Sequence, residues 1–100
     1  MELQENDNYD IIWTDTFKQE LVAIYYYILY KLREPSIAKK FYANVINQLD
    51  TLKQFPEKFP RLFLNQNNLN IRKMNINNYI IIYNVENQIN IVSILHIFNR

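Results

Sequence analysis

Apolar residues at helical spacing predict two helices in the first half of the chain. The first set recurs every three or four residues: Phe17, Leu21, Ile24, Ile28 and Leu32. This period is typical of an amphipathic helix that buries one face. Just before it, Thr14-Asp15-Thr16 offers side chains that can cap a helix, and Thr16 with Gln19 fits a capping box. We therefore expect the helix to begin at this segment, before Phe17.

The second set begins after Glu34-Pro35-Ser36, where proline interrupts the first helix and suits an opening turn. Its apolar positions are Ala38, Phe41, Tyr42, Val45, Leu49 and Leu52. Because only a few residues join the two helices, they should pack as an antiparallel hairpin. Tyrosines flank the first helix, and we expect them at the edge of the core with hydrated hydroxyls: Tyr25, Tyr26, Tyr27 and Tyr30.

Shorter runs of β-prone residues predict four strands. The expected strands are Tyr9–Trp13, Leu69–Ile76, Tyr79–Asn84 and Gln88–Ile97. Residues 55–68 contain two prolines and a polar Asn-Gln-Asn-Asn run, which predicts a loop. Asn77-Asn78 and Glu86-Asn87 lie where tight hairpin turns are needed. The last three strands should therefore form an antiparallel meander.

The run from Tyr79 to Tyr83 is apolar on both faces, which is typical of a central, covered strand. The predicted fold is α+β: an N-terminal strand, an antiparallel helical hairpin, then a three-stranded antiparallel meander. Two helices can cover only one face of this sheet. The other face must be covered by something else, or it is an exposed apolar patch that binds a partner.

Composition narrows the chemistry. The chain has no glycine and fifteen asparagines, so we expect asparagine wherever the backbone needs a positive φ. It has no cysteine and a single histidine, His96, which excludes disulfides, thiolate nucleophiles and a site built of several imidazoles. Carboxylates do not cluster along the sequence, so we expect neither a metal nor an organic cofactor.

Charge is distributed unevenly. Residues 1–20 carry six acids and one base, a net charge of −5, whereas residues 31–73 carry nine bases and three acids, a net charge of +6. The basic part could bind an acidic protein or nucleic acid, or could be a solvated helical face. We predict an acidic tail over residues 1–8 and one domain over residues 9–100. The acidic N-terminus does not resemble a secretory signal and no apolar run could span a membrane, so we expect a cytoplasmic protein.

Six segments in a fixed order then carry a family resemblance. They are Phe17–Ile28, Pro35–Phe41, Leu52–Arg61, Ile71–Met74, Tyr79–Val85 and Ile94–His96. Each is mostly hydrophobic spacing, but their order and intervals resemble the ParE/RelE superfamily of type II toxins, on its ParE-like branch. The resemblance covers residues 9–97. It implies a helical hairpin packed on an antiparallel sheet, and an antitoxin that wraps the toxin with a helix and an extended segment.

The resemblance leaves the target open, because ParE-like toxins poison DNA gyrase and RelE-like toxins cut messenger RNA on the ribosome. RelE-like toxins take an arginine from the position that is Ile80 here, and their later cation and tyrosine are replaced by Ile97 and Phe98 or lie beyond the end of the sequence. A metal-independent ribonuclease would have to use other residues for proton transfer and charge stabilisation. The candidates are Arg72, Lys73, His96 and Arg100.

Gyrase poisoning needs a binding surface and no catalytic group on this chain, so we favour it over RNA cleavage. The expected outcome is growth inhibition that a cognate antitoxin relieves. The expected partner contacts are basic and aromatic: Arg61, Arg72, Lys73, Tyr79, Tyr83, His96, Phe98 and Arg100. A third possibility is a degenerate module that binds antitoxin without toxicity, which the missing arginine at Ile80 keeps open.

Overall fold

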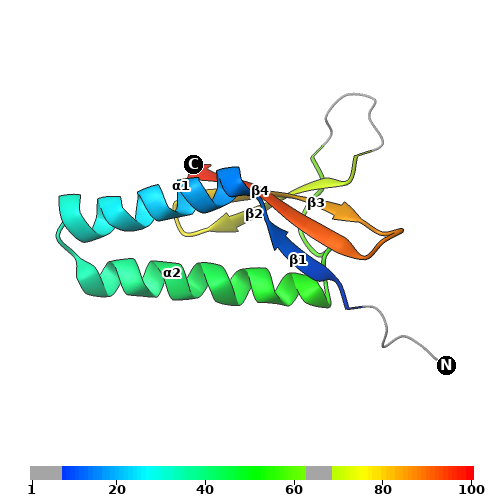
Figure 1. Ribbon diagram of the computed structural model, residues 1–100, viewed down its shortest axis with the longest axis horizontal. Helices are drawn as coiled ribbons and strands as arrows, with labels where there is room; N and C mark the ends of the chain where they lie inside the picture. The colour runs from blue at the N-terminus through cyan, green and yellow to red at the C-terminus, as the bar shows by residue number, and fades with distance from the viewer. Residues whose placement is uncertain (1–7, 63–68) are drawn as a thin grey trace.

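The computed structural model describes residues 8–62 and 69–100 and contains the predicted sequence of elements. In chain order these are β1 (Asp10–Trp13), α1 (Asp15–Tyr26), α2 (Pro35–Asp50), β2 (Ile71–Ile76), β3 (Tyr79–Glu86) and β4 (Ile91–Asn99). Most of the predicted acidic tail, and the polar run at residues 65–68, lie outside the described residues. Figure 1 shows the two helices side by side along the length of the molecule.

The four strands form one sheet in the order β1-β4-β3-β2. The predicted meander is confirmed, since β2, β3 and β4 pair antiparallel. The sheet as a whole is mixed, because β1 pairs parallel to β4, and the purely antiparallel sheet that the resemblance implied is wrong. The reason is topological: the hairpin brings the chain back to the start of β1, where the amide of Tyr9 donates to Lys53 O at 2.8 Å. β2 therefore runs in the same direction as β1. The chain reverses at the turn into β3 and again at the turn into β4, so β4 is parallel to both β1 and β2.

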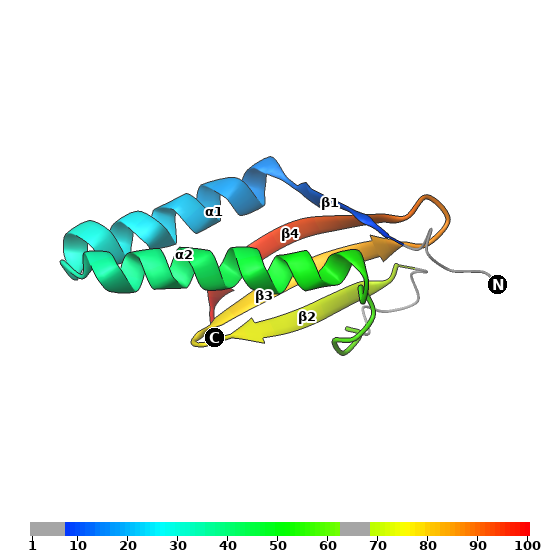
Figure 2. The same ribbon diagram turned by 90° about the horizontal axis from the view of Figure 1, so that it is seen from below.

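Both helices pack on the same face of the sheet (Figure 2). The core between them combines apolar positions of both helices with alternate residues of the strands. Its fully buried members include Phe17, Leu21, Val45, Leu52, Met74, Ile81, Tyr83, Val92 and Ile94. The two helical stripes are thus confirmed, apart from Leu32 and Tyr42, which are exposed.

The start of α1 lies in the predicted segment Thr14-Asp15-Thr16, but its cap differs from the predicted capping box. Thr14 is the N-cap: its hydroxyl oxygen accepts from the amide of Phe17 at 3.2 Å and the hydroxyl donates to Ile94 O at 2.7 Å. Thr16 lies inside the first turn and is exposed, so the predicted Thr16–Gln19 capping box is wrong. Thr14 is preferred because it can cap the helix and bind β4 with the same hydroxyl.

The end of the first helix also departs from the sequence pattern. A π-helical turn, η2 (Tyr27–Lys31), follows α1, and the chain then reverses at Arg33 with φ 56°. The wider π turn rotates later side chains, which leaves Leu32 outside the core. Within the described residues, Asn77 and Asn90 also have positive φ, as predicted for asparagine, whereas Arg33 was not expected there.

The second hairpin turn is later than predicted. β3 continues to Glu86, and the turn occupies residues 87–90 with Asn90 in the left-handed region. β4 consequently starts at Ile91 and extends to Asn99. Along the described part of the chain, none of the helices has the length and apolarity needed to cross a membrane.

Candidate partner-binding site

The face of the sheet that the helices leave uncovered is the first candidate site. Strand pairing places two rows of side chains across it. One row is Lys73, Ile82 and His96, and the next is Asn75, Ile80 and Phe98. We call these six residues the open face. Phe98 is 44% exposed and the two isoleucines are partly exposed, whereas their neighbour Ile81 on the helix side is 0% exposed.

This exposure tests the prediction that the middle strand is covered on both sides. β3 is a central strand, as expected, but its two faces are not equivalent, because the helices bury one of them and the described residues cover the other only in part. An apolar strip bordered by Lys73 and His96 is a surface on which a protein segment could bury apolar side chains.

His96 is held at the edge of this face by an irregularity in β4. The pairing of β3 with β4 shifts between Ile82 and Tyr83, which leaves Leu95 as an extra residue. Such a bulge bends a strand and re-aims its side chains. His96 Nδ1 lies 3.2 Å from Glu20 Oε2, and the amide of Ile97 donates to Glu20 Oε1 at 3.0 Å. The Glu20 carboxylate of α1 therefore accepts a backbone hydrogen bond from β4 at the edge that lies beyond the end of β1. The sequence pattern did not indicate this role.

Arg72 lies on the other face and holds the loop between α2 and β2. Its guanidinium donates to the carbonyl oxygens of Glu57 (2.9 Å) and Phe59 (2.7 Å) and, through Nε, to Asn70 Oδ1 (3.0 Å). Its side chain is 15% exposed, and Nη2 is 3.7 Å from the Glu57 carboxylate. Most of its donors are thus used inside the protein.

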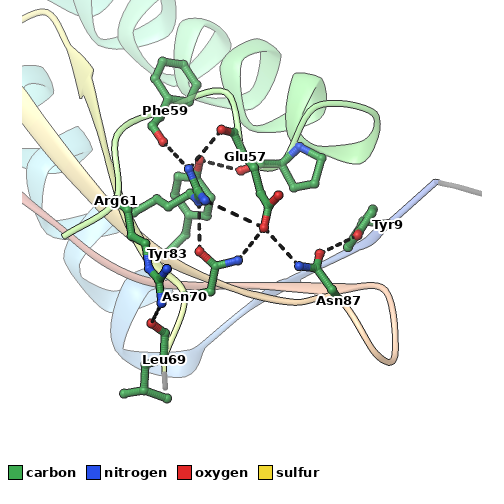
Figure 3. A network of polar contacts seen from close by, with 10 residues as sticks. Tyr9, Glu57, Phe59, Arg61, Leu69, Asn70, Tyr83 and Asn87 are labelled. Carbon is green, nitrogen blue, oxygen red and sulfur yellow. Dashed lines mark hydrogen bonds and ion pairs between the residues drawn. The ribbon is translucent and has the colours of Figure 1, made fainter. Parts of the chain in front are cut away.

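Glu57 is the centre of the same network. Its Oε2 accepts from Asn70 Nδ2 at 2.6 Å and from Asn87 Nδ2 at 3.0 Å, and Asn87 Oδ1 in turn accepts from the Tyr9 hydroxyl at 2.6 Å. Hydrogen bonds from Asn87 and Asn70, with a smaller contribution from Arg72, lower the pKa of the Glu57 carboxyl. Figure 3 shows that this network joins the loop, the start of β2 and the turn after β3.

The two predicted tyrosines also belong to the helix side. Tyr83 is 0% exposed, its hydroxyl donates to Pro56 O at 2.8 Å, and burial raises its pKa to about 12. A partner cannot touch Tyr83 in this conformation, so its predicted partner contact does not fit the structure. Tyr79 is half-buried against Phe41, with ring centroids 5.0 Å apart, and burial raises its pKa.

The remaining predicted residues lie at the periphery. Arg61 is exposed and donates through Nη2 to Leu69 O at 3.0 Å. Arg100 is tied to the turn between β2 and β3, where its amide donates to Asn78 O at 2.8 Å and Nη1 to Asn77 O at 3.3 Å. Both arginines keep further donors that no described residue occupies.

The four nuclease candidates do not converge on one point. Arg72 and Lys73 are consecutive in β2 and project to opposite faces. Lys73 and His96 share a row but are separated by Ile82 of the intervening strand, which corresponds to about 10 Å. Arg100 is held at the β2–β3 turn. Lys73 and His96 lie on the same face of the sheet, and Arg72 projects to the opposite one.

Comparison with known proteins identifies the group to which this arrangement belongs. Residues 11–100 match the family model described as "ParE toxin of type II toxin-antitoxin system, parDE". The chain belongs to the ParE toxin family. The resemblance of the sequence to ParE-like toxins is thereby confirmed. A search of curated protein sequences gives no match to this ParE family member.

Solved structures similar to this ParE family member share its fold at low sequence identity. The chromosomal ParDE system of P. aeruginosa gives a TM-score of 0.73 at 20% identity, over 93% of this chain and 97% of that one. The RelBE2 toxin–antitoxin complex of Mycobacterium tuberculosis gives 0.66 at 18%, over 93% and 99%. The archaeal RelE–RelB complex of Pyrococcus horikoshii gives 0.68 at 20%, over 93% and 96%. ParE and RelE structures are thus both similar in fold, and fold alone does not choose a target.

Proposed function

We propose that the chain is the toxin of a type II toxin–antitoxin pair, that it acts in the cytoplasm by binding and poisoning DNA gyrase, and that a cognate antitoxin neutralises it by covering the open face. Family membership supports the toxin role. Similar folds occur in a ParDE system and in two RelB–RelE complexes, which supports a protein partner that masks the toxin.

The partly exposed apolar strip on the open face carries this proposal. Ile80, Ile82 and Phe98 lie on a surface that the protein's own helices cannot reach. An amphipathic segment could place its apolar side chains on this strip and acidic groups beside Lys73. Binding of this kind requires no catalytic group, which is also true of gyrase poisoning.

RelE-like cleavage of messenger RNA is the second candidate, and the pair formed by His96 and Glu20 favours it. An imidazole that is hydrogen-bonded to a carboxylate is a common general acid or base. Against it, Arg72 is engaged in the loop network, and Ile80 occupies the position at which RelE-like toxins carry an arginine. The cations that would stabilise a phosphorane are therefore not gathered around His96.

Purified toxin distinguishes these targets when it is added to gyrase with relaxed plasmid, and separately to translating ribosomes. We expect loss of supercoiling with accumulation of cleaved DNA, reversed by antitoxin encoded next to the toxin gene. Unchanged supercoiling at a large excess of toxin would exclude gyrase as the target. Ribosome-dependent transcript cleavage that disappears in His96→Ala would establish the nuclease instead. Absence of growth arrest at adequate expression would favour a module that only binds antitoxin.

A further inference from the structure

A second exposed surface lies on the helical hairpin. Seven of the twelve large apolar side chains that are exposed in the described part of the chain are residues of the hairpin, and four of the seven are tyrosines: Val22, Tyr26, Tyr27, Tyr30, Leu32, Ile37 and Tyr42. The sequence pattern predicted tyrosines at the edge of the core, yet Tyr30 is 68% exposed. In both views the closed end of the hairpin projects beyond the sheet (Figures 1 and 2).

Between the helices this surface forms a groove of about 280 Å³. Val22, Tyr25 and Tyr26 of α1 line one side, and Lys39, Tyr42 and Ala43 of α2 line the other. The rings also contact one another. Tyr26 and Tyr30 stack with centroids 5.5 Å apart and planes at 23°, and the Tyr25 ring meets Tyr42 edge-on at 5.9 Å. The aromatic rings are thus held in place before any ligand arrives.

The hairpin also carries four cations, Lys31, Arg33, Lys39 and Lys40, of which Lys39 lines the groove. All four are exposed, and none forms an ion pair with another residue in 8–62 or 69–100. Residues 31–40 contain one acid, Glu34, so the segment has a net charge of +3. The rings and these cations together are called the hairpin surface below.

The backbone at Arg33 gives an independent indication. Its φ of 56° lies in the left-handed region, which is unfavourable for a residue with a long side chain. The protein uses asparagine at the other two positive-φ positions found in its described part, Asn77 and Asn90. Arginine at the hairpin therefore does not help the chain to fold. Residues held in such strained conformations occur preferentially at functional sites. The unfavourable backbone at Arg33 therefore indicates a function for its exposed guanidinium group.

The nature of the ligand follows from charge and shape. A second copy of the chain is a poor fit, because a symmetric contact would bring the four cations of each copy together. Phosphates would neutralise the cations, and nucleobases offer flat faces that stack on tyrosine. An acidic protein segment would supply the charge without such a face. We propose that the hairpin surface binds single-stranded nucleic acid, with phosphates on the four cations and bases on Tyr26 and Tyr30. This function goes beyond the proposed toxin–antitoxin role and requires neither antitoxin nor gyrase.

The test uses the purified full-length chain and a fluorescent twelve-nucleotide oligothymidine, with affinity measured by anisotropy at several salt concentrations. Arg33→Asn is the decisive variant. Asparagine suits the left-handed backbone, so the variant should unfold at the same temperature as the wild type or higher. It should bind about five-fold more weakly at 0.1 M salt, and its log–log salt slope should be about 0.7 smaller in magnitude. Arg33→Lys, which keeps the charge, should retain most of the affinity.

Tyr30→Leu tests stacking separately, because it keeps apolar volume and charge but removes the ring. We expect affinity to fall about 5- to 100-fold with an unchanged salt slope. Wild-type protein that fails to bind the oligonucleotide at 20 mM salt, or Arg33→Asn that binds as tightly as wild type, would refute the proposal. Equal affinity for polyglutamate of the same charge would assign the surface to an acidic protein. Because these assays contain no gyrase or antitoxin, a negative result here leaves the proposed toxin function untouched.

Discussion

At the scale of single residues, Glu57 and Arg72 show how a polar network fixes an irregular segment. The described part of the loop after α2 pairs with β2 only around Arg61, so the carbonyl groups before it need other donors. Arg72 supplies two of these donors, and the Glu57 carboxylate accepts hydrogen bonds from the side-chain amides of Asn70 and Asn87. The network therefore determines where the loop lies on the sheet.

The lowered pKa of Glu57 makes this part of the stability depend on pH. A carboxyl whose pKa is lower in the folded chain stabilises it above the unfolded value of about 4.3, and the contribution is lost as the pH falls through the folded value. We expect Glu57→Gln to melt a few degrees below wild type at pH 7, and the difference to narrow below pH 4.5. Thermal melts from pH 7 to pH 3 measure it. A difference that stays constant over this range would mean that the Glu57 charge does not contribute.

The same residues mark the limit of prediction from sequence. Arg72 and Tyr83 were expected at a partner surface because of their charge and chemistry. Whether such a side chain faces outward depends on the register of β2 against β3 and on the position of residues 55–60. Neither can be inferred from local spacing, since a shift of one residue would exchange the two faces of a strand.

At the scale of elements, the hydroxyl of Thr14 joins helix α1 to strand β4. It accepts from the α1 amide of Phe17 and donates to β4. Thr14→Ala should reduce the free energy of unfolding by about 1–2 kcal/mol, which corresponds to roughly 4–15 °C in a domain of this size. Thr16→Ala, at the exposed position where the sequence suggested a capping box, is the matched control and should change stability little. Urea or thermal unfolding of the two variants measures this, and equal destabilisation by both would contradict the assignment of Thr14 as the cap.

Sequence periodicity predicted the two α-helices and the four strands but not their exact ends. Helical stripes and β-prone runs reflect burial at many positions. The pattern therefore still predicts the element when single positions deviate from it. Three other features depend instead on tertiary contacts at a single place in the fold. They are the parallel pairing of β1, the π turn before Arg33 and the bulge at Leu95. The turn after β3 shows the same limit, because Asn87 and Asn90 both suit a turn and only the pairing of Glu86 with Ile91 selects the later position.

At the scale of the whole molecule, the fold separates two surfaces. The helices cover one side of the sheet, which leaves the open face on the other, and their own closed end extends past the sheet to present the hairpin surface (Figure 1). A partner on the open face would therefore not have to displace a ligand from the outer groove between Tyr26 and Tyr42. One small domain could thus be masked on one surface while a different ligand occupies the other.

One-sided burial of the sheet can be tested with two consecutive residues of β3. Ile81 is 0% exposed under the helices, whereas Ile82 lies on the open face and is partly exposed. Replacement by threonine keeps the β-branched shape at both positions. In the free chain, Ile81→Thr should lower the free energy of unfolding by about 2–4 kcal/mol, and Ile82→Thr by less than about 1 kcal/mol.

Urea unfolding of the isolated chain measures this difference in stability. The affinity for antitoxin then tests whether the open face is buried in the complex. If the open face is covered only in the complex, Ile82→Thr should weaken antitoxin binding about ten-fold, which corresponds to about 1.4 kcal/mol, because threonine offers the antitoxin less apolar surface to bury. Val22→Thr, in the groove between α1 and α2, should leave that affinity unchanged. Equal destabilisation of the free chain by Ile81→Thr and Ile82→Thr would mean that the chain already seals both sides of its sheet, which would remove the basis for a partner at the open face.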